Sequence, residues 1–186
     1  MIVDFWFDPS CPFTWTTSRW LVEAATVRPI TIRWRLLSLA ALNEHLEVNP
    51  EGDTEGYLWY PARICAAVQE GYGTAALGAF YAAFASRTDW DAAAALAEAG
   101  LPLELAEAAT SERYDDELRA STARGIAKVG PHVGTPILAV GDTACFGPVL
   151  SRVPEGEAAG RLLDAVLVIA GTPGFHELKG PPPPEV

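Results

Sequence analysis

Cys11 stands in the sequence DPSCPFT, between an apolar segment and the first stretch with helical spacing. A thiol at the N-terminus of a helix faces unpaired backbone N–H groups and the positive end of the helix dipole, which favour its anion. We therefore expect Cys11 to ionise more readily than a free cysteine and to act as a nucleophile. Pro12 suits the first helical turn, where its missing N–H needs no partner. The alternative is a small buried residue at a helix start.

Gly134-Thr135-Pro136 is the second feature that could do chemistry, because it opens a predicted strand. A proline there forfeits a ladder hydrogen bond unless a special turn is needed. A cis bond before Pro136 would present the Thr135 backbone to an extended ligand, whereas the alternative is an ordinary strand-initiating proline. If this strand runs antiparallel to the first, Thr135 and Pro136 face Cys11.

Residues that follow Cys11 could complete a site. Thr14 could donate a hydrogen bond to the thiolate from one helical turn away, or it could simply fill the space. Phe13 and Trp15 could line an apolar substrate wall or pack into the core. Asn43 follows the second predicted strand, at the sheet edge where Cys11 is expected, and is a candidate ligand contact.

Three further candidates lie later in the chain. Trp59 and Arg63 are four residues apart and share a helix face that could close over the cleft. Arg63 could bind a substrate carboxylate or form a structural ion pair. His132 precedes the turn at Thr135 and could supply a proton, or it could be a solvated loop histidine.

The remaining cysteines do not resemble partners for Cys11. Cys65 lies in an apolar helical run and is predicted to pack in the core. Cys145 is expected two strands away from Cys11, which is too far for a direct disulfide. The chain has no Cys/His spacing typical of a metal site and no glycine-rich phosphate loop, so we expect neither a metal nor a tightly bound cofactor.

The elements that position these residues follow from hydrophobic periodicity. Residues 2–7 read as a buried strand, 10–27 as a helix and 30–37 as a second, alternating strand. Strand, helix and strand over so few residues form a right-handed βαβ unit with parallel strands. Residues 39–130 are almost entirely helical in pattern and rich in alanine. Breaks between these helices are expected at 50–54, 71–73, 87–89, 100–102 and 110–111.

Strand patterns return at 136–140 and 143–146, separated by a Gly-Asp hairpin signal, and a last helix covers roughly 155–170. The order β-α-β, helices, β-β-α predicts an α/β, thioredoxin-like fold with a helical insertion between its two halves. We therefore predict a thioredoxin-like core at residues 1–38 and 131–178, a helical lid at 39–130, and a proline-rich tail at 179–186.

The chain resembles the DsbA-like thioredoxin-fold oxidoreductases, and within them the actinobacterial branch that includes mycothiol-dependent nitroreductases. VDFWFDP with a following CP, together with a later GTP, carries the resemblance, which extends through LSLAALNE and WYPAR to VGTPILAV and FGPVLSRVPEGEAAG. It implies a thioredoxin fold with a helical lid, a nucleophilic cysteine and a cis-proline. It also implies a low-molecular-weight thiol, mycothiol, as co-substrate.

The chain departs from that family's C-x-x-C motif, because CPFT places Thr14 where the second cysteine would stand. We therefore expect a thiol-dependent oxidoreductase with one nucleophilic cysteine, which a free small thiol regenerates. One alternative is a non-redox thiol-dependent transferase or isomerase that resembles 2-hydroxychromene-2-carboxylate isomerase. A further alternative is a catalytically silent binding module.

Composition limits the partners. The 186 residues include 13 basic and 24 acidic side chains, for a net charge of −11, which disfavours nucleic acids and anionic membranes. No apolar run reaches the ~18 residues of a membrane span, and the first residues lack the features of a signal peptide. The three cysteines are too few and too far apart in sequence for a disulfide framework, so these features together predict a cytoplasmic protein. The expected partners are a small-molecule substrate and a small thiol, with a homodimer as an open alternative.

Overall fold

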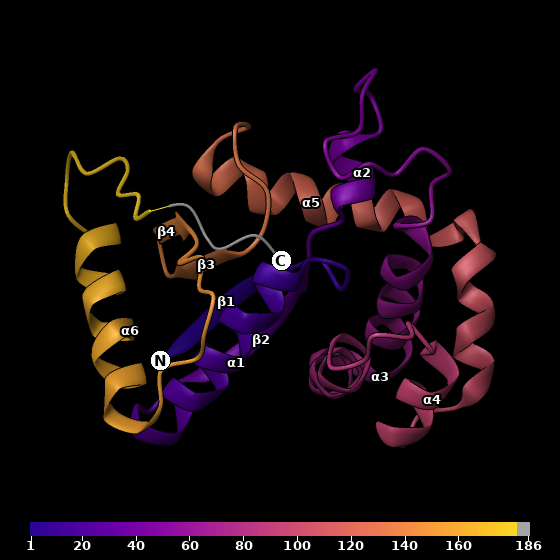
Figure 1. The fold of residues 1–186 in the computed structure, drawn as a ribbon, viewed down its shortest axis with the longest axis horizontal. Coiled ribbons are helices and arrows are strands. Elements are labelled where there is room, and N and C mark those ends of the chain that lie inside the picture. The colour runs from indigo at the N-terminus through magenta and orange to yellow at the C-terminus, as the bar shows by residue number, and fades with distance from the viewer. Residues whose placement is uncertain (182–186) are drawn as a thin grey trace.

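The computed structural model describes residues 1–181 of the chain (Figure 1). Residues 182–186, which form most of the predicted proline-rich tail, lie outside the described residues. Four strands form one sheet in the order β2-β1-β3-β4. The strands are β1 (Ile2–Phe7), β2 (Thr31–Leu36), β3 (Ile137–Val140) and β4 (Thr143–Phe146).

The pairing of the strands confirms the predicted topology. β1 and β2 are parallel, β3 is antiparallel to β1, and β4 is antiparallel to β3. Phe7 lies opposite Leu36, and Trp6 lies opposite Ile137. The ends of β1 and β2 and the beginning of β3 therefore meet at one edge of the sheet, and Cys11 follows β1 at this edge.

Helices and 3₁₀ segments make up most of the rest of the described chain, with loops between them. They are α1 (Pro12–Val27), α2 (Leu39–Asn43), α3 (Trp59–Ala85), α4 (Ala92–Glu98), the 3₁₀ segments η1 (Leu103–Thr110) and η2 (Glu112–Tyr114), α5 (Asp115–Val129) and α6 (Gly156–Ala170). The predicted break at 71–73 lies within α3, where Gly73 has a φ of 81°. Glycine adopts this left-handed conformation readily because it has no Cβ, and it interrupts the helix there.

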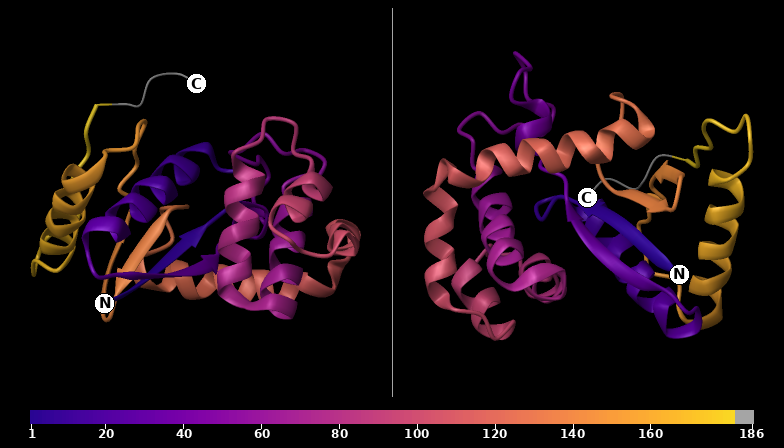
Figure 2. Two further views of the ribbon diagram at one scale, coloured as in Figure 1. Left: turned by 90° about the horizontal axis from the view of Figure 1, so that it is seen from below. Right: turned by 180° about the vertical axis from the view of Figure 1, so that it is seen from behind.

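Different helices cover the two faces of the sheet (Figure 2). Side chains along each strand alternate between these faces. Phe5 and Phe7 of β1 belong to the larger core, together with buried residues of α1, α3 and α6. Trp6 and Ile137 point to the opposite face, where Ile126 of α5 packs against their cluster. The predicted α/β fold class is thus confirmed, and the structure shows that helices lie on both faces of the sheet.

Helix α3 packs closely against β2 at Gly78. A Cβ at this position would overlap the indole ring of Trp34. Trp34 is itself buried, and its ring lies edge-on to Phe5, Phe7 and Tyr81 at centroid distances of 5.7, 5.9 and 5.8 Å. Glycine at position 78 thus allows α3 to lie directly against the aromatic cluster beneath the end of β1.

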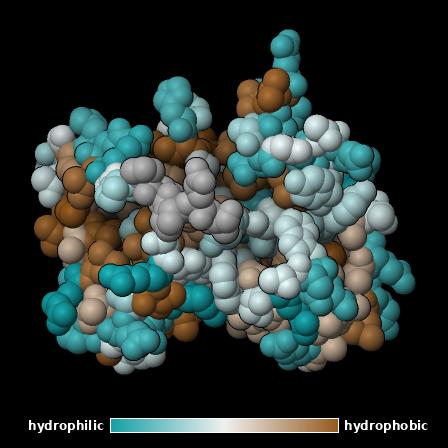
Figure 3. All heavy atoms as spheres, in the orientation of Figure 1, coloured by the Kyte–Doolittle hydropathy of each residue, from teal (hydrophilic) through white to brown (hydrophobic). Residues whose placement is uncertain are grey.

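The surface is mixed in polarity. Figure 3 shows apolar residues gathered on the side of the molecule where α6 lies, and Val168 of α6 is 70% exposed. Hydrophilic residues cover much of the remaining face, as the acidic composition predicts. Within residues 1–181, no helix combines the length and the hydropathy needed to cross a membrane.

Candidate active site

A buried carboxylate organises the loop between β1 and α1. Asp8 has no exposed surface, and its Oδ1 accepts hydrogen bonds from the backbone N–H of Ser10 at 2.8 Å and from the Ser10 hydroxyl. Its Oδ2 accepts a hydrogen bond from the N–H of Leu39 at 2.7 Å. Because Leu39 is the first residue of α2, Asp8 joins the loop before Cys11 to the segment that follows β2.

Cys11 is the N-cap residue of α1, as the sequence predicted. Its N–H donates to the carbonyl of Asp8 at 3.3 Å, and its carbonyl accepts the N–H of Trp15 at 3.1 Å. The side chain is half-buried and packs beside a cluster that includes Leu37 and Ile137. The thiol therefore lies where the first helix meets the edge of the sheet.

The predicted ease of ionisation is wrong, because burial raises the pKa of the Cys11 thiol above its ordinary value. Hydrogen bonding from the Thr14 hydroxyl, and from the backbone N–H groups of Thr14 and Phe13, lowers this pKa, while the nearby Asp8 carboxylate raises it. The N–H groups at the helix N-terminus do face the sulfur, but they do not replace all of the water that the thiolate loses on burial.

Thr14 and Thr135 meet although 121 positions separate them in the chain. Their Oγ1 atoms lie 3.2 Å apart, and both side chains are buried. Thr135 donates its hydroxyl proton to the carbonyl of Trp6 at 3.1 Å, so Thr14 is the donor between the two threonines. Thr14 has one hydroxyl proton, so the Cys11 thiolate and Thr135 compete for it.

The Thr135–Pro136 peptide bond is cis, and Pro136 is buried directly before β3. Thr135 contacts the turn of α1 that follows Cys11, as the hydrogen bond to Thr14 shows. The antiparallel pairing of β3 with β1 therefore brings this segment to the Cys11 edge of the sheet.

A cavity of about 140 Å³ opens beside the thiol. Its walls come from the loop before α1, from α1 itself, and from the end of α3 with the turn that follows. The lining residues are Pro9, Ser10, Cys11, Pro12, Trp15, Phe84, Ala85, Arg87 and Trp90. We call this cavity the Cys11 cleft.

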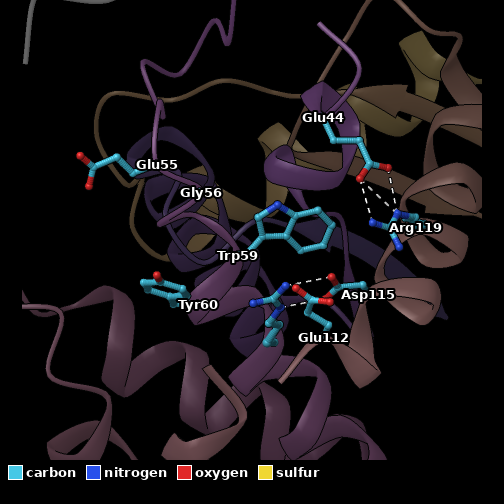
Figure 4. Close-up of a pocket in the computed structure, with 9 residues that line it drawn as sticks. Glu44, Glu55, Gly56, Trp59, Tyr60, Glu112, Asp115 and Arg119 are labelled. Atoms are coloured by element: carbon cyan, nitrogen blue, oxygen red, sulfur yellow. Dashed lines mark hydrogen bonds and ion pairs between the residues drawn. The ribbon is translucent and has the colours of Figure 1, made fainter. Parts of the chain in front are cut away.

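Trp59 and Arg63 line a different and larger cavity of about 400 Å³ (Figure 4). No residue is common to the linings of the two cavities. Arg63 donates to both carboxylate oxygens of Asp115, at 2.8 and 2.9 Å, and both side chains are buried. The structure thus gives Arg63 the ion pair that was its alternative role.

Other candidates from the sequence lie outside the lining of the Cys11 cleft. Asn43 is buried at the end of α2, Phe13 is half-buried on α1, and His132 is exposed in the turn before β3. Cys65 is fully buried in α3, as predicted, and β3 separates Cys145 on β4 from β1.

Three contributors to the site were missed by reasoning from sequence. Asp8 was read only as the residue after the first strand, although its side chain joins the loop before Cys11 to the start of α2. Arg87 and Trp90 fall in or beside the predicted break at 87–89, and a break signal does not show where the side chains of a turn point. Among residues 1–181, no cluster of His, Cys, Asp or Glu could hold a metal ion.

The burial of Asp8 predicts a pH-dependent contribution to stability. Burial raises the pKa of Asp8 from 3.8 to about 6, although hydrogen bonds from Ser10 and Leu39 oppose the rise. The folded state therefore holds this proton more tightly than the unfolded chain does. The stabilisation is complete below about pH 4 and is lost as the pH rises towards 6. The free energy of unfolding should fall by up to about 3 kcal/mol from this group.

Urea unfolding at several pH values between 4 and 7 measures this effect. The free energy of unfolding of the native protein, minus that of Asp8→Asn, should decrease over that range, because Asn does not titrate. The hydrogen bonds lost in Asp8→Asn lower its stability at every pH and leave the slope of the difference unchanged. Parallel curves for the two proteins would contradict the prediction.

The strand order, the parallel β1–β2 pair and a cysteine at the N-terminus of α1 define a thioredoxin-like fold. The fold is similar to that of 2-hydroxychromene-2-carboxylate isomerase, with a TM-score of 0.62 and 16% identity over 90% of this chain and 95% of that one. It is also similar to that of the cytosolic disulfide reductase DsbM from Pseudomonas aeruginosa, with a TM-score of 0.54 and 17% identity over 91% of this chain and 100% of that one. A third similar structure is that of DsbA from Mycobacterium tuberculosis, with a TM-score of 0.53 and 16% identity over 87% of this chain and 88% of that one. The predicted fold class is confirmed.

Residues 10–180 match the Rv2466c-like family, described as mycothiol-dependent nitroreductase Rv2466c, and the chain belongs to this family. The chain is also 33% identical over 193 residues to the uncharacterised protein Rv2286c of Mycobacterium tuberculosis, which covers 98% of this chain and 83% of that protein. The resemblance found in the sequence is thus confirmed, and the chain is a member of a family of thiol-dependent oxidoreductases.

Proposed function

We propose that this protein is a cytoplasmic thiol-dependent oxidoreductase with Cys11 as its single nucleophile and a low-molecular-weight thiol, mycothiol, as co-substrate. The observation that carries the proposal is the placement of Cys11. It caps α1, lines a cleft and has a threonine, not a cysteine, one helical turn away. The family description supports the choice of mycothiol. Helices between β2 and β3 act as the lid that the sequence suggested, since the end of α3 forms one wall of the cleft.

The reaction begins with attack of the Cys11 thiolate on one sulfur of a disulfide substrate. The S–S bond of the substrate breaks, a mixed disulfide forms on Cys11, and the other half leaves as a thiolate that takes up a proton. The co-substrate thiolate then attacks the substrate sulfur of the mixed disulfide and releases Cys11. One disulfide and one thiol enter, and one disulfide and one thiol leave.

The surroundings of Cys11 serve both steps. A thiolate with a raised pKa is a stronger nucleophile but a poorer leaving group. The N–H groups of Phe13 and Thr14, with the Thr14 hydroxyl, stabilise negative charge on the sulfur when Cys11 leaves. Thr14 supplies this bond by turning its proton from Thr135 towards the sulfur.

No second cysteine among the described residues is placed to resolve the mixed disulfide. Cys65 is fully buried in α3 and Cys145 lies on the far side of β3. The pKa of Cys145 is raised to about 11 by burial, and burial raises that of Cys65 well above its ordinary value. Regeneration of Cys11 therefore depends on a thiol from solution.

The test is to trap a mixed disulfide on Cys11 and follow its loss by mass spectrometry. In the native protein, the rate should rise in proportion to the concentration of added thiol. Thr14→Cys should add a rapid loss that is independent of added thiol, because an internal thiol acts at high effective concentration. Thr14→Ser is the matched control and should behave like the native protein. Rapid loss that is independent of thiol in the native protein would overturn the single-cysteine mechanism.

A second candidate is a thiol-dependent transferase or isomerase, which the threonine at position 14 favours because no internal resolving step is needed. The fold likeness to 2-hydroxychromene-2-carboxylate isomerase is compatible with it. In this case the bound thiol cofactor would supply the reacting sulfur. Activity in Cys11→Ser would then persist with thiol present, whereas the oxidoreductase mechanism requires its loss.

A further inference from the structure

The wall of the Cys11 cleft opposite α1 is built from the end of α3 and the turn that follows it. Phe84 and Ala85 belong to α3, while Arg87 and Trp90 lie in the turn between α3 and α4. Neither Arg87 nor Trp90 has a role in the exchange steps described above. Both residues nevertheless line the same cavity as the nucleophile, which places them beside any substrate bound there.

Trp90 is held in an unusual conformation. Its φ is 56°, and it is the only non-glycine residue with a positive φ in the described part of the chain. A bulky residue in this region costs about 1–3 kcal/mol, so the surrounding packing must fix it. The indole ring lies at centroid distances of 6.0 Å from Phe84 and 6.2 Å from Tyr57. Trp90 still remains 42% exposed, so a fixed aromatic surface lies at the cleft.

Arg87 brings a positive charge to the same wall. Its one ion pair among the described residues is with Glu98, at 3.3 Å, and the Glu98 side chain is 60% exposed. Exposed pairs of this kind contribute little, so a better anion can replace Glu98. Within residues 1–181, the one hydrogen bond that the guanidinium group donates runs from Nη2 to Glu98, and Nη1 has no partner. The guanidinium group of Arg87 can therefore donate further hydrogen bonds to a bound anion.

Arg87 carries the one fixed charge among the residues that line the Cys11 cleft. The protein as a whole has a net charge of −11. An anion is therefore repelled by the protein in general and attracted at this wall. A guanidinium group pairs with a carboxylate through two parallel hydrogen bonds, which fix orientation as well as charge.

We infer that Arg87 and Trp90 form a substrate-recognition wall that selects a small flat ring bearing a carboxylate. The ring would lie against Trp90, and the carboxylate would bind Arg87. The volume of about 140 Å³ corresponds to roughly five water molecules, which limits the bound group to about one ring. This inference rests on the proposal that the Cys11 cleft is the active site.

Benzoate and benzamide are suitable probes because they have the same shape and differ in charge. Their dissociation constants for the native protein can be measured by ligand-observed NMR at one ionic strength. Benzoate should bind at least about tenfold more tightly, since hydrogen bonds between charged groups are the stronger ones. Benzoate, at a saturating concentration, should also slow alkylation of Cys11, which places its site in the cleft.

Variants identify the residues responsible. Arg87→Gln should remove the preference for benzoate, and Arg87→Lys should retain part of it. Trp90→Ala should weaken the binding of both probes to a similar extent. Arg113→Gln is the matched control, because Arg113 also forms an exposed ion pair, with Glu70, and does not line the cleft. It should leave both dissociation constants unchanged.

Two results would overturn the inference: equal affinity of the native protein for the two probes, or a preference that persists in Arg87→Gln. Neither measurement needs turnover, so the inference can be tested separately from the proposed function. If Cys11 exchanges thiols but the probes bind alike, the recognition wall alone is wrong. If the probes behave as expected but Cys11 forms no mixed disulfide, the wall stands and the proposed exchange chemistry fails.

Discussion

Replacing Cys11 with serine should lower the rate of thiol–disulfide exchange by at least about a thousandfold. A serine hydroxyl is not ionised at neutral pH and cannot form the mixed disulfide. Incubation with a small disulfide, followed by mass spectrometry, should show an adduct on the native protein and none at position 11 of the variant. Because burial raises the pKa of the Cys11 thiol, the rate for the native protein should increase as the pH rises above neutrality.

Cys145→Ser is the control for this experiment. Cys145 is also half-buried, but it lies on β4 and does not line the Cys11 cleft. Its replacement should leave the exchange rate within about twofold of the native value, as expected for a site away from the chemistry. If adducts formed first on Cys145, or if Cys145→Ser abolished exchange, the assignment of Cys11 as nucleophile would be wrong.

Gly78→Ala should destabilise the fold by about 3 kcal/mol, near the upper end of the usual cost of overpacking a core. The added Cβ would overlap the indole of Trp34, which is buried among Phe5, Phe7 and Tyr81. Trp34 cannot move aside without disturbing these rings. Equilibrium unfolding in urea should therefore show a lower midpoint with a similar slope.

Gly71→Ala provides the matched control in the same helix. A Cβ at position 71 meets nothing within 4 Å, and the backbone there is not in the left-handed region. Alanine favours helix over glycine by about 1 kcal/mol, so this variant should be as stable as the native protein or slightly more so. Equal stability of the Gly78→Ala and Gly71→Ala proteins would show that α3 does not pack on Trp34 as described.

Much of the fold could be predicted because its signals are local. The apolar run at 2–7 and the alternation at 30–37 reflect the period of a strand, and Pro12 marks the first turn of a helix. The parallel β1–β2 pair followed from the short βαβ connection, which leaves few topologies open. Recognition of the family depended likewise on short motifs around Cys11 and Pro136.

Features that depend on packing between distant elements could not be predicted from the sequence. Helical spacing placed Trp59 and Arg63 on one face, but only the docking of α3 against α5 shows Arg63 paired with Asp115 in a separate cavity. In the same way, the turn after α3 brings Arg87 to the Cys11 cleft from far along the chain.

Cys11 has one property that the local sequence determines and another that only the tertiary packing determines. The sequence by itself determined its place at the start of a helix and the threonine one turn later, because both are matters of local spacing. The tertiary structure decided the pKa of its thiol, because the loss of water around the sulfur depends on every element packed nearby. Helix position is encoded in a few adjacent residues, whereas desolvation is a property of the assembled fold.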